Sequence, residues 1–396
     1  MEMERRGIDM KVLKFINNNK ENWKELLSKA PYYITIKEDG PYYLLKYNQL
    51  DSDNSYEIVR ECRGCIVRYD MSKDEYICVC RPFDRFFNYG EPNAAEIDWH
   101  SAFVNEKIDG SLIKFWYSKY DGWHLSTNNS IDAFDAPVSN SIEGLTFGNL
   151  VERALGCNWL SFCRELDEHY TYMFELVSPE SQVTIHYDHT TLYYLGQRDN
   201  ILYGEYYGFD PVWREFGVEQ PKRFYLSSLN ECIEAAEQMT KDEEGMVVVD
   251  ANHNRIKIKS PEYLIAAHAA NNGKLGLRTA VRLIREDKVD DFLAYAPMHR
   301  AKMELIIAAY EDIKEHFWEQ FCKVRHLCWM SRKTYVYALN LEGLTKDGFN
   351  FAIWAYDHRE NNVNDYMNTL TERSIMNRIK DRVKDVKNEL EMEEDE

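Results

Sequence analysis

The sequence predicts an α+β domain built on antiparallel sheets, followed by an all-helical domain. Short β-rich runs separated by turn residues recur from Tyr32 to Lys259. Beyond Lys259 the strand pattern stops, and residues 301–330 continue with helical periodicity. A chain of 396 residues is long enough for two domains, which we expect at residues 1–262 and 263–396.

The elements of the first domain can be placed in chain order. Residues 9–30 fit one helix or two short ones, because a polar run at 17–20 interrupts their apolar stripe. A hairpin turning at Asp39-Gly40 follows, since Asp-Gly is a preferred hairpin turn. Further strands are expected at 64–69, 76–80, 112–117, 123–127, 172–177, 183–187, 191–196, 245–250 and 255–259. Helices are expected at 141–155 and 226–240.

The charge and cysteine content limit the classes of function. The net charge is −19, and residues 381–396, with eight acids and three bases, contribute −5 (3 − 8) of it. Any nucleic-acid contact must therefore come from a localised basic site. Nine scattered cysteines favour a reducing compartment, the cytoplasm, or the host cytoplasm for a viral protein. We expect no membrane span, no secretory signal and, without a heptad run, a monomer.

Lys107 is the first candidate for chemistry. It lies between two predicted strands in the run VNEKIDGS, where Gly110 permits tight backbone geometry. A lysine is a nucleophile only when neutral, which requires desolvation or nearby positive charge. Taken alone, the motif is better explained as an exposed hairpin turn, because Asp-Gly is an ordinary turn pair.

Later residues strengthen the hypothesis for Lys107. Lys257 and Lys259 alternate on one predicted strand, so both ammonium groups emerge on one face and suit a triphosphate, unless that face is simply polar. Glu175 interrupts the apolar run YTYMFELV, where a carboxylate is costly unless it is paired, metal-bound or on an edge strand facing water. Glu244 opens the partner strand of the lysine pair. Together these residues predict a nucleotide and Mg²⁺ pocket.

An ordered set of motifs carries a family resemblance. Lys107-Ile108-Asp109-Gly110 resembles the K-x-D-G of covalent nucleotidyltransferases, which include ATP-dependent ligases and mRNA capping guanylyltransferases. The wider set is similar to the RNA ligase 1 family of T-even bacteriophages. It comprises Tyr47-Asn48, Glu61-Cys62-Arg63-Gly64, Arg81-Pro82, Phe86-Phe87-Asn88, the residues from Lys107 to Leu112, FELV around Glu175, EEGMVVV around Glu244, Lys257-Ile258-Lys259-Ser260, Tyr263 and Arg332-Lys333-Thr334-Tyr335.

This resemblance implies a complete reaction. The first domain would be an ATP-grasp-like nucleotidyltransferase in which Lys107 attacks the α-phosphate of ATP, expels pyrophosphate and holds AMP. The AMP would pass to an RNA 5′-phosphate, and an RNA 3′-hydroxyl would then displace it and join the strand. The resemblance also implies Mg²⁺ or Mn²⁺ as cofactor, cleaved tRNA among the substrates, substrate specificity in the helical domain, and an end-healing kinase or phosphatase as partner.

The resemblance also implies the positions that contact the nucleotide and the metal. The nucleotide-contacting positions would be Tyr47, Arg63, Arg85, Phe87, Glu106, Gly110, Glu175, Glu244, Lys257 and Lys259, with Tyr263 as a further site residue. Glu175 and Glu244 would also bind the metal. Asp290-Asp291 resemble a paired carboxylate that binds a divalent ion in the helical domain, and a solvated helix start explains that pair equally well.

Two positions depart from the family pattern. The family usually has Lys where Arg85 stands, which keeps the charge but changes its geometry. It tends to have a basic residue where Asn128 stands, so this chain lacks a cation that would take part in phosphate handling in one step.

Other interpretations remain. Cys62-x-x-Cys65 and Cys78-x-Cys80 have spacing that could suit zinc, although buried thiols are favoured. A GTP-using capping guanylyltransferase would carry an OB-fold after the lysine pair, where this chain becomes helical. A catalytically inactive RNA-binding scaffold with the ligase fold is the alternative from another functional class.

Overall fold

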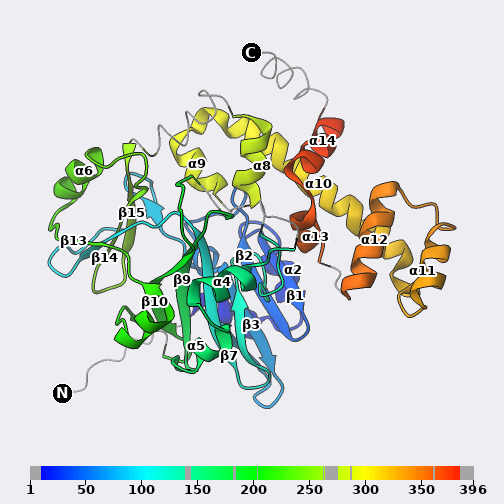
Figure 1. Cartoon of the computed structure of the whole chain (residues 1–396), viewed down its shortest axis with the longest axis horizontal. Coiled ribbons are helices and arrows are strands. Elements are labelled where there is room, and N and C mark those ends of the chain that lie inside the picture. The colour runs from blue at the N-terminus through cyan, green and yellow to red at the C-terminus, as the bar shows by residue number, and fades with distance from the viewer. Residues whose placement is uncertain are drawn as a thin grey trace. The chain divides into compact units, whose positions relative to one another are not determined.

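The computed structural model describes residues 10–138, 144–181, 184–202, 204–261, 263, 275–285, 288–359 and 362–383. The chain divides into two compact units, residues 1–272 and 273–396. All strands of the described residues lie in the first unit, and the described part of the second is helical (Figure 1). The predicted α+β class, with antiparallel sheets and a helical C-terminal region, is confirmed. No helix of the described residues is long and apolar enough to cross a bilayer.

The N-terminal part of the first unit is a four-stranded antiparallel sheet covered on one face by short helices. The strands are β1 (Ile34–Asp39), β2 (Tyr42–Tyr47), β3 (Arg63–Asp70) and β4 (Glu75–Cys80), in that order. The β1–β2 hairpin turns at Gly40, whose φ of 52° favours glycine. The covering helices are α1 (Lys11–Asn18), α2 (Trp23–Leu27) and α3 (Glu57–Glu61).

Glu61 joins the first helix to this sheet. Its carboxylate accepts hydrogen bonds from the backbone N–H of Lys11, at 3.0 Å, and of Val12, at 2.7 Å. These are two of the four N–H groups that the start of a helix leaves without an intrahelical partner. Burial, reinforced by nearby Asp84, raises the pKa of Glu61 to about 7.

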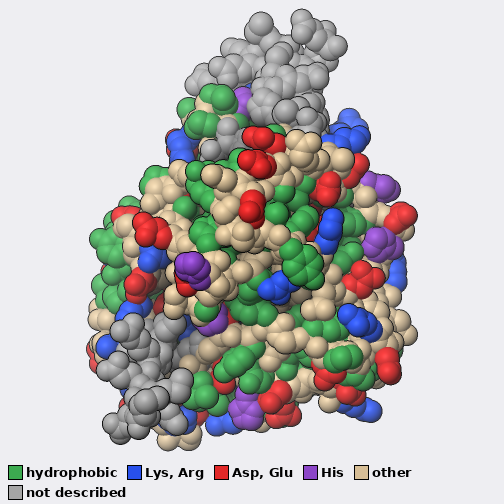
Figure 2. Space-filling view, turned by 90° about the vertical axis from the view of Figure 1, so that its left-hand side faces the viewer, with side chains coloured by type: hydrophobic (Ala, Val, Ile, Leu, Met, Phe, Trp, Pro, Cys, Tyr) green, Lys and Arg blue, Asp and Glu red, His purple; other side chains and the backbone are tan. Residues whose placement is uncertain are grey.

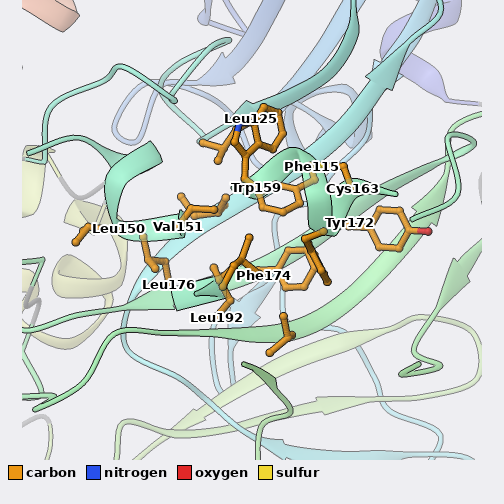
Figure 3. Close-up of a cluster of buried hydrophobic side chains, with 14 of the residues drawn as sticks. Phe115, Leu125, Leu150, Val151, Trp159, Cys163, Tyr172, Phe174, Leu176 and Leu192 are labelled. Atoms are coloured by element: carbon orange, nitrogen blue, oxygen red, sulfur yellow. The ribbon is translucent and has the colours of Figure 1, made fainter. Parts of the chain in front are cut away.

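A six-stranded sheet forms the centre of the unit. Its order is β11-β10-β9-β7-β8, with β12 beside β10. The bounds are β7 (Ser111–Ser118), β8 (Gly122–Ser126), β9 (Tyr170–Val177), β10 (Thr191–Asp199), β11 (Glu205–Tyr206) and β12 (Val218–Glu219). Side chains alternate on a strand, so Tyr172, Phe174 and Leu176 face one side. There they pack with α4 (Phe147–Leu155) and α5 (Trp159–Cys163) in an aromatic core (Figure 3).

A third sheet has five strands in the order β13-β6-β14-β15-β5. Their bounds are β5 (Phe87–Asn88), β6 (Phe103–Glu106), β13 (Arg223–Phe224), β14 (Gly245–Val249) and β15 (Arg255–Lys259). Helix α6 (Leu229–Glu237) covers one face and buries Val104, Ile256 and Ile258. The charged residues of β15, which alternate with these isoleucines, therefore lie on its opposite face.

The second unit packs its helices around their own apolar core. The helices are α8 (Leu277–Arg285), α9 (Val289–Tyr295), α10 (Arg300–Val324), α11 (Arg332–Leu339), α12 (Lys346–His358), α13 (Val363–Thr369) and α14 (Glu372–Arg382). Phe317 of α10 and Phe351 of α12 are fully buried, with ring centroids 6.0 Å apart. Arg285 donates to the backbone oxygens of Met367 and Leu370, which ties α8 to the end of α13.

The structure corrects some predicted elements. The strand expected at 183–187 is wrong for its described residues 184–187, which form a loop. Its backbone N–H groups at Thr184 and Ile185 donate to Asp109 rather than to a neighbouring strand. The helix expected at 141–155 begins at Phe147, capped by Thr146, and residues 141–143 lie outside the described residues.

Candidate active site

Lys107 lies in a connection between two different sheets. β6 belongs to the five-stranded sheet and β7 to the six-stranded sheet, so residues 107–110 cross from one to the other. The Lys107 backbone N–H donates to the Gly245 carbonyl, 2.9 Å away, which fixes the loop against β14. The hairpin-turn interpretation of this motif is therefore wrong.

Two lysines share one buried carboxylate. The Nζ of Lys107 lies 2.7 Å from Oε2 of Glu244, and the Nζ of Lys259 lies 3.4 Å from Oε1. The Glu244 side chain is 1% exposed, against 16% for Lys107 and 9% for Lys259. Gly245, the residue after Glu244, lets β14 and β15 lie close together here, since a Cβ on it would lie 2.2 Å from the Ile258 carbonyl oxygen. The structure thus brings together three residues that are up to 152 positions apart (259 − 107).

Three cations, rather than two, line one face of β15. Lys257 and Lys259 share a face, as the alternation predicted, and Arg255 precedes them on it. The intervening Ile256 and Ile258 point to the opposite side, into the core beneath α6. Arg255 was missed by sequence reasoning, although the alternating run RIKIK contains the signal.

A buried ion network fixes Arg255. Its guanidinium donates to Glu205 at 2.8 Å, and Glu205 also accepts from Arg198, whose Nε is 2.8 Å away. Arg198 in turn pairs with Asp84. Burial alone would raise the pKa of Glu205, but the charges of Arg255 and Arg198 hold it well below its usual range. Glu205 is thus a fixed anion, and Arg255 is held rigidly.

Phe86 is the centre of a cation cluster. Its ring centroid lies 5.0 Å from the Nζ of Lys257, 5.3 Å from the Cζ of Arg255 and 5.6 Å from the Cζ of Arg63. The negative face of an aromatic ring attracts cations at such distances. Phe86 therefore offsets part of the repulsion among three like charges and limits where they can move. It occurs in the quoted family motif but was not among the predicted contact positions.

Arg85 lies between two predicted pocket aromatics. Its Cζ is 4.4 Å from the ring centroid of Tyr47 and 5.2 Å from that of Phe87. A planar guanidinium can stack against two rings in a way that a lysine ammonium cannot. The two rings therefore suit an arginine at residue 85, where the family usually has a lysine. Because β5 pairs in parallel with β15, with Phe87 opposite Ile256, this group adjoins the cation row.

The residues after Lys107 fit closely against their surroundings. Asp109 is buried, and its Oδ2 accepts from the backbone N–H of Thr184 and Ile185, both at 2.9 Å. A Cβ on Gly110 would lie 2.4 Å from the Leu176 carbonyl oxygen and 3.0 Å from Cγ of Glu175. The loop therefore requires glycine at residue 110, and Glu175 lies beside it.

Glu175 is on an interior strand rather than an edge. β9 pairs with β7 and β10, placing Glu175 opposite Leu112 and Tyr193. Its neighbours Phe174 and Leu176 face the aromatic core, so the carboxylate points to the other side of the sheet. The edge-strand explanation is therefore wrong, and the half-buried acid has a specific location near the Lys107 loop.

Two other predicted positions have different surroundings. Glu106 accepts a hydrogen bond from the backbone N–H of Lys222, and burial raises the pKa of its carboxyl group. Tyr263 lies next to Lys259, whose Nζ is 5.8 Å from its ring centroid, and its hydroxyl donates to Thr184. Tyr187, which was not predicted, accepts from the backbone N–H of Asp109 at 3.3 Å.

The predicted metal ligands belong to both units of the chain. Asp290 lies in the first turn of α9 in the helical unit, whereas Glu175 and Glu244 belong to the first unit. The Asp291 side chain lies outside the described residues. Across the described residues, no group of three or more His, Cys, Asp or Glu side chains could hold a metal ion. However, Oε1 of Glu244 is buried and accepts no hydrogen bond among them, although the Lys259 ammonium lies 3.4 Å from it. That oxygen would suit a cation brought in with a ligand.

A buried lysine lies near the second departure from the family pattern. Lys114 is fully buried and donates to the carbonyl oxygen of Gly64, and burial lowers the pKa of its ammonium group. A Cβ on Gly64 would lie 3.0 Å from Nζ of Lys114 and 2.9 Å from Oδ1 of Asn128. Lys114 was not predicted. The four cysteines of the possible zinc spacing, Cys62, Cys65, Cys78 and Cys80, are buried free thiols.

Charges on the surface are mixed. On the face shown in Figure 2, acidic and basic side chains are interspersed rather than gathered into a broad patch of one sign. The cations of the candidate site are instead partly or fully buried on β15 and around Phe86. With a net charge of −19, any contact with nucleic acid must come from such a localised basic site.

Comparisons with known proteins identify relatives. Residues 61–263, just over half of the chain, match the sequence model of the family described as RNA ligase. A protein of Autographa californica nuclear polyhedrosis virus, described as a bifunctional polynucleotide kinase/RNA ligase, is 34% identical over 317 residues. That match covers 74% of this chain but only 42% of the relative, so the chain spans less than half the length of that protein.

Two further matches extend the comparison. The RNA ligase of Rhodothermus phage RM378 is 25% identical over 350 residues, covering 73% of this chain and 77% of the phage protein. Among solved structures, an archaeal ATP-dependent RNA ligase aligns with a TM-score of 0.41 at 12% identity. That alignment covers 74% of this chain and 79% of the other.

Proposed function

The chain belongs to the RNA ligase family whose model matches residues 61–263, and on that premise we propose that it is an ATP-dependent RNA ligase that attaches AMP to Lys107. The observation that carries the proposal is the shared carboxylate, with Lys107 and Lys259 on the two oxygens of buried Glu244. A structural ion pair needs one lysine. A second lysine on the same carboxylate, beside a row of further cations, suits an anionic ligand.

The first step uses residues already in contact. Glu244 is 2.7 Å from Nζ of Lys107 and is positioned to receive its proton, which leaves a neutral amine as nucleophile. The amine attacks the α-phosphorus of ATP, a P–N bond forms, and the bond to the pyrophosphate oxygen breaks. Lys257 and Lys259 hold phosphate oxygens, with Arg63 beside them, and offset the negative charge that develops there.

The later steps transfer the AMP. The 5′-phosphate oxygen of an RNA strand attacks the lysyl-bound phosphorus, and Lys107 leaves as an amine. An RNA 3′-hydroxyl then attacks the activated 5′-phosphorus, forming the phosphodiester and releasing AMP. We assign the nucleotide chemistry to residues 1–262 and substrate specificity to residues 263–396. Repair of broken RNA, including tRNA, fits this order of steps, and the relative described as a kinase/ligase supports an end-healing partner.

A divalent ion, Mg²⁺ or Mn²⁺, fits the proposal. Mg²⁺ commonly binds through one or two carboxylates together with substrate phosphates, so a cluster of three protein acids is unnecessary. Glu244, whose Oε1 accepts no hydrogen bond among the described residues, and Glu175 would supply those carboxylates. When bound, the ion would neutralise charge on the phosphate oxygens.

The test is covalent labelling. The purified chain is incubated with α-labelled ATP or GTP and a divalent ion, and label surviving denaturing electrophoresis is measured. We expect labelling by ATP that disappears in Lys107→Ala and Lys259→Ala. Lys119→Ala, which removes a lysine that is 60% exposed, is the matched control and should label normally.

Each other outcome would reject the proposal in a defined way. Labelling by GTP alone would indicate a capping guanylyltransferase. Absence of label from the folded wild-type chain would indicate a scaffold. Normal labelling in Lys259→Ala would contradict the placement of β15 against the phosphates. Joining of 5′-phosphorylated RNA, compared with DNA of the same sequence, tests the polymer.

A further inference from the structure

A basic, acid-free segment lies in the helical unit. Between Glu319 and Glu342 the chain has no Asp or Glu, although acids outnumber bases by 19 in the whole sequence. The segment carries four permanent positive charges, Lys323, Arg325, Arg332 and Lys333. We call residues 320–341 the basic segment. It comprises the end of α10, a short 3-10 turn at Arg325–Leu327, and α11.

The basic segment exposes two large aromatic side chains. Trp329 is 81% exposed, and Tyr337 on α11 is 68% exposed. The backbone beside Trp329 is held by the Tyr356 hydroxyl, which donates to the Met330 carbonyl oxygen at 2.7 Å. Helix α11 is held by Tyr335, which is fully buried and stacks on Tyr356 with ring centroids 4.6 Å apart. An exposed tryptophan on an anchored backbone is a preformed platform for a ligand, since little conformational freedom is lost on binding.

Cations accompany these aromatic groups. Lys333 and Tyr337 are four residues apart on α11, so they share one face of that helix. Arg332 has a structural role, because it links α11 to α12 by donating two hydrogen bonds, of 2.6 and 2.7 Å, to Asp357. Arg325 and Lys333 are exposed, and within the described part of the helical unit neither makes an ion pair. Their charges are therefore available to an anionic ligand.

We propose that the basic segment binds unpaired RNA, with a base stacked on Trp329 and backbone phosphates at Arg325 and Lys333. Each unpaired nucleotide presents a flat aromatic face and a phosphate, which is the combination that exposed aromatic rings and neighbouring cations recognise. In a duplex the base faces are covered by stacking, so single-stranded RNA fits and double-stranded RNA does not. The proposal rests on the proposed ligase function and identifies a substrate contact for it.

The stacking contact is tested by RNA binding to the full-length chain. Fluorescence anisotropy of a labelled single-stranded RNA gives Kd for wild type, Trp329→Ala, Trp329→Phe and the control Met298→Ala. Met298 is 73% exposed elsewhere in the helical unit, so its loss should leave Kd unchanged. Trp329→Ala should weaken binding by roughly 5- to 150-fold, the range for loss of one stacked base, and Trp329→Phe should retain most of the affinity.

The phosphate contacts are tested by salt dependence. For single strands the slope of log Kobs against log salt is about −0.7 per neutralised phosphate. The double variant Arg325→Ala/Lys333→Ala should therefore reduce the magnitude of the slope by roughly 1.4. Arg373→Ala removes an exposed cation on α14 and should leave the slope unchanged.

The two proposals fail separately. If wild type is labelled by ATP but Trp329→Ala, folded by circular dichroism, binds RNA with wild-type Kd, the surface proposal is overturned and the ligase proposal stands. Binding of duplex RNA as tight as that of single strands would also overturn it. If wild type binds RNA through Trp329 but is never labelled by ATP, the ligase function fails and the surface stands as an RNA-binding site.

Discussion

Replacing Phe86 by Leu tests whether its ring organises the cation cluster. Leucine keeps an apolar side chain in the loop but removes the aromatic face that lies 5.0 Å from Lys257 and 5.6 Å from Arg63. Phe86→Tyr keeps the ring and is the matched control. The perturbation therefore changes the electrostatics at the centre of the cluster while leaving every proposed reacting group in place.

The expected magnitude follows from the contacts. A cation–π contact is worth about 0.5–1 kcal/mol at exposed sites and about 2 kcal/mol when desolvated. Lys257 and Arg63 are the two contacts proposed to lie near phosphate, so about 1–3 kcal/mol of positioning is at stake. At about 1.4 kcal/mol per factor of ten, adenylylation should slow by roughly 5- to 150-fold.

The assay is single-turnover labelling of the chain by α-labelled ATP over a range of ATP concentrations. Phe86→Leu should lower the maximum labelling rate or raise the ATP concentration at half-maximum, whereas Phe86→Tyr should stay near wild type. A parallel thermal melt separates slower chemistry from loss of fold. Labelling by Phe86→Leu at the wild-type rate and ATP dependence would refute a positioning role.

Two further predictions concern the loop and the pH dependence of stability. Gly110→Ala places a Cβ 2.4 Å from the Leu176 oxygen and should slow labelling on the order of 100-fold, whereas Gly208→Ala, with open space around residue 208, should not. Because burial raises the pKa of Glu61 to about 7, the folded chain binds more protons there than the unfolded chain does. Its contribution is complete below about pH 4 and is lost as pH rises through 7, on the order of 3 kcal/mol in unfolding free energy. Denaturant titrations from pH 4 to 8 should show this slope flattened in Glu61→Gln but retained in Glu57→Gln, and equal slopes in all three proteins would contradict it.

Local patterns predicted much of the fold because they depend on neighbouring residues. β-rich runs identified both strands of the β14–β15 hairpin, and alternation identified the shared face of Lys257 and Lys259. The strand expected at 183–187 failed for a non-local reason: the backbone there is satisfied by Asp109, some 75 residues away. An apolar run cannot reveal whether its N–H groups will meet a strand or a carboxylate.

The sequence predicted the site residues that belong to a recognisable motif. It did not predict the contacts that form between strands far apart in the sequence. Phe86 and Lys257 come together because β5 pairs in parallel with β15, a crossover that no local spacing encodes. Lys114 was missed because its strand looks amphipathic, whereas both faces of the central sheet are covered and its ammonium group is buried against Gly64. The hairpin interpretation of Lys107 failed because β6 and β7 do not pair with each other: β6 pairs with β13 and β14, whereas β7 pairs with β8 and β9 in another sheet.

The acidity of the chain is consistent with the proposed chemistry once burial is considered. Surface acids are screened by water and salt, whereas Glu205 and Glu244 act on their cationic neighbours at low exposure. Glu205 accepts hydrogen bonds from Arg255 and Arg198 and so fixes Arg255, the first cation on β15. Glu244 divides its charge between Lys107 and Lys259, so a phosphate approaching Lys259 would free the carboxylate to accept the Lys107 proton. Under the proposed function, nucleotide binding and activation of the nucleophile are therefore coupled through one carboxylate.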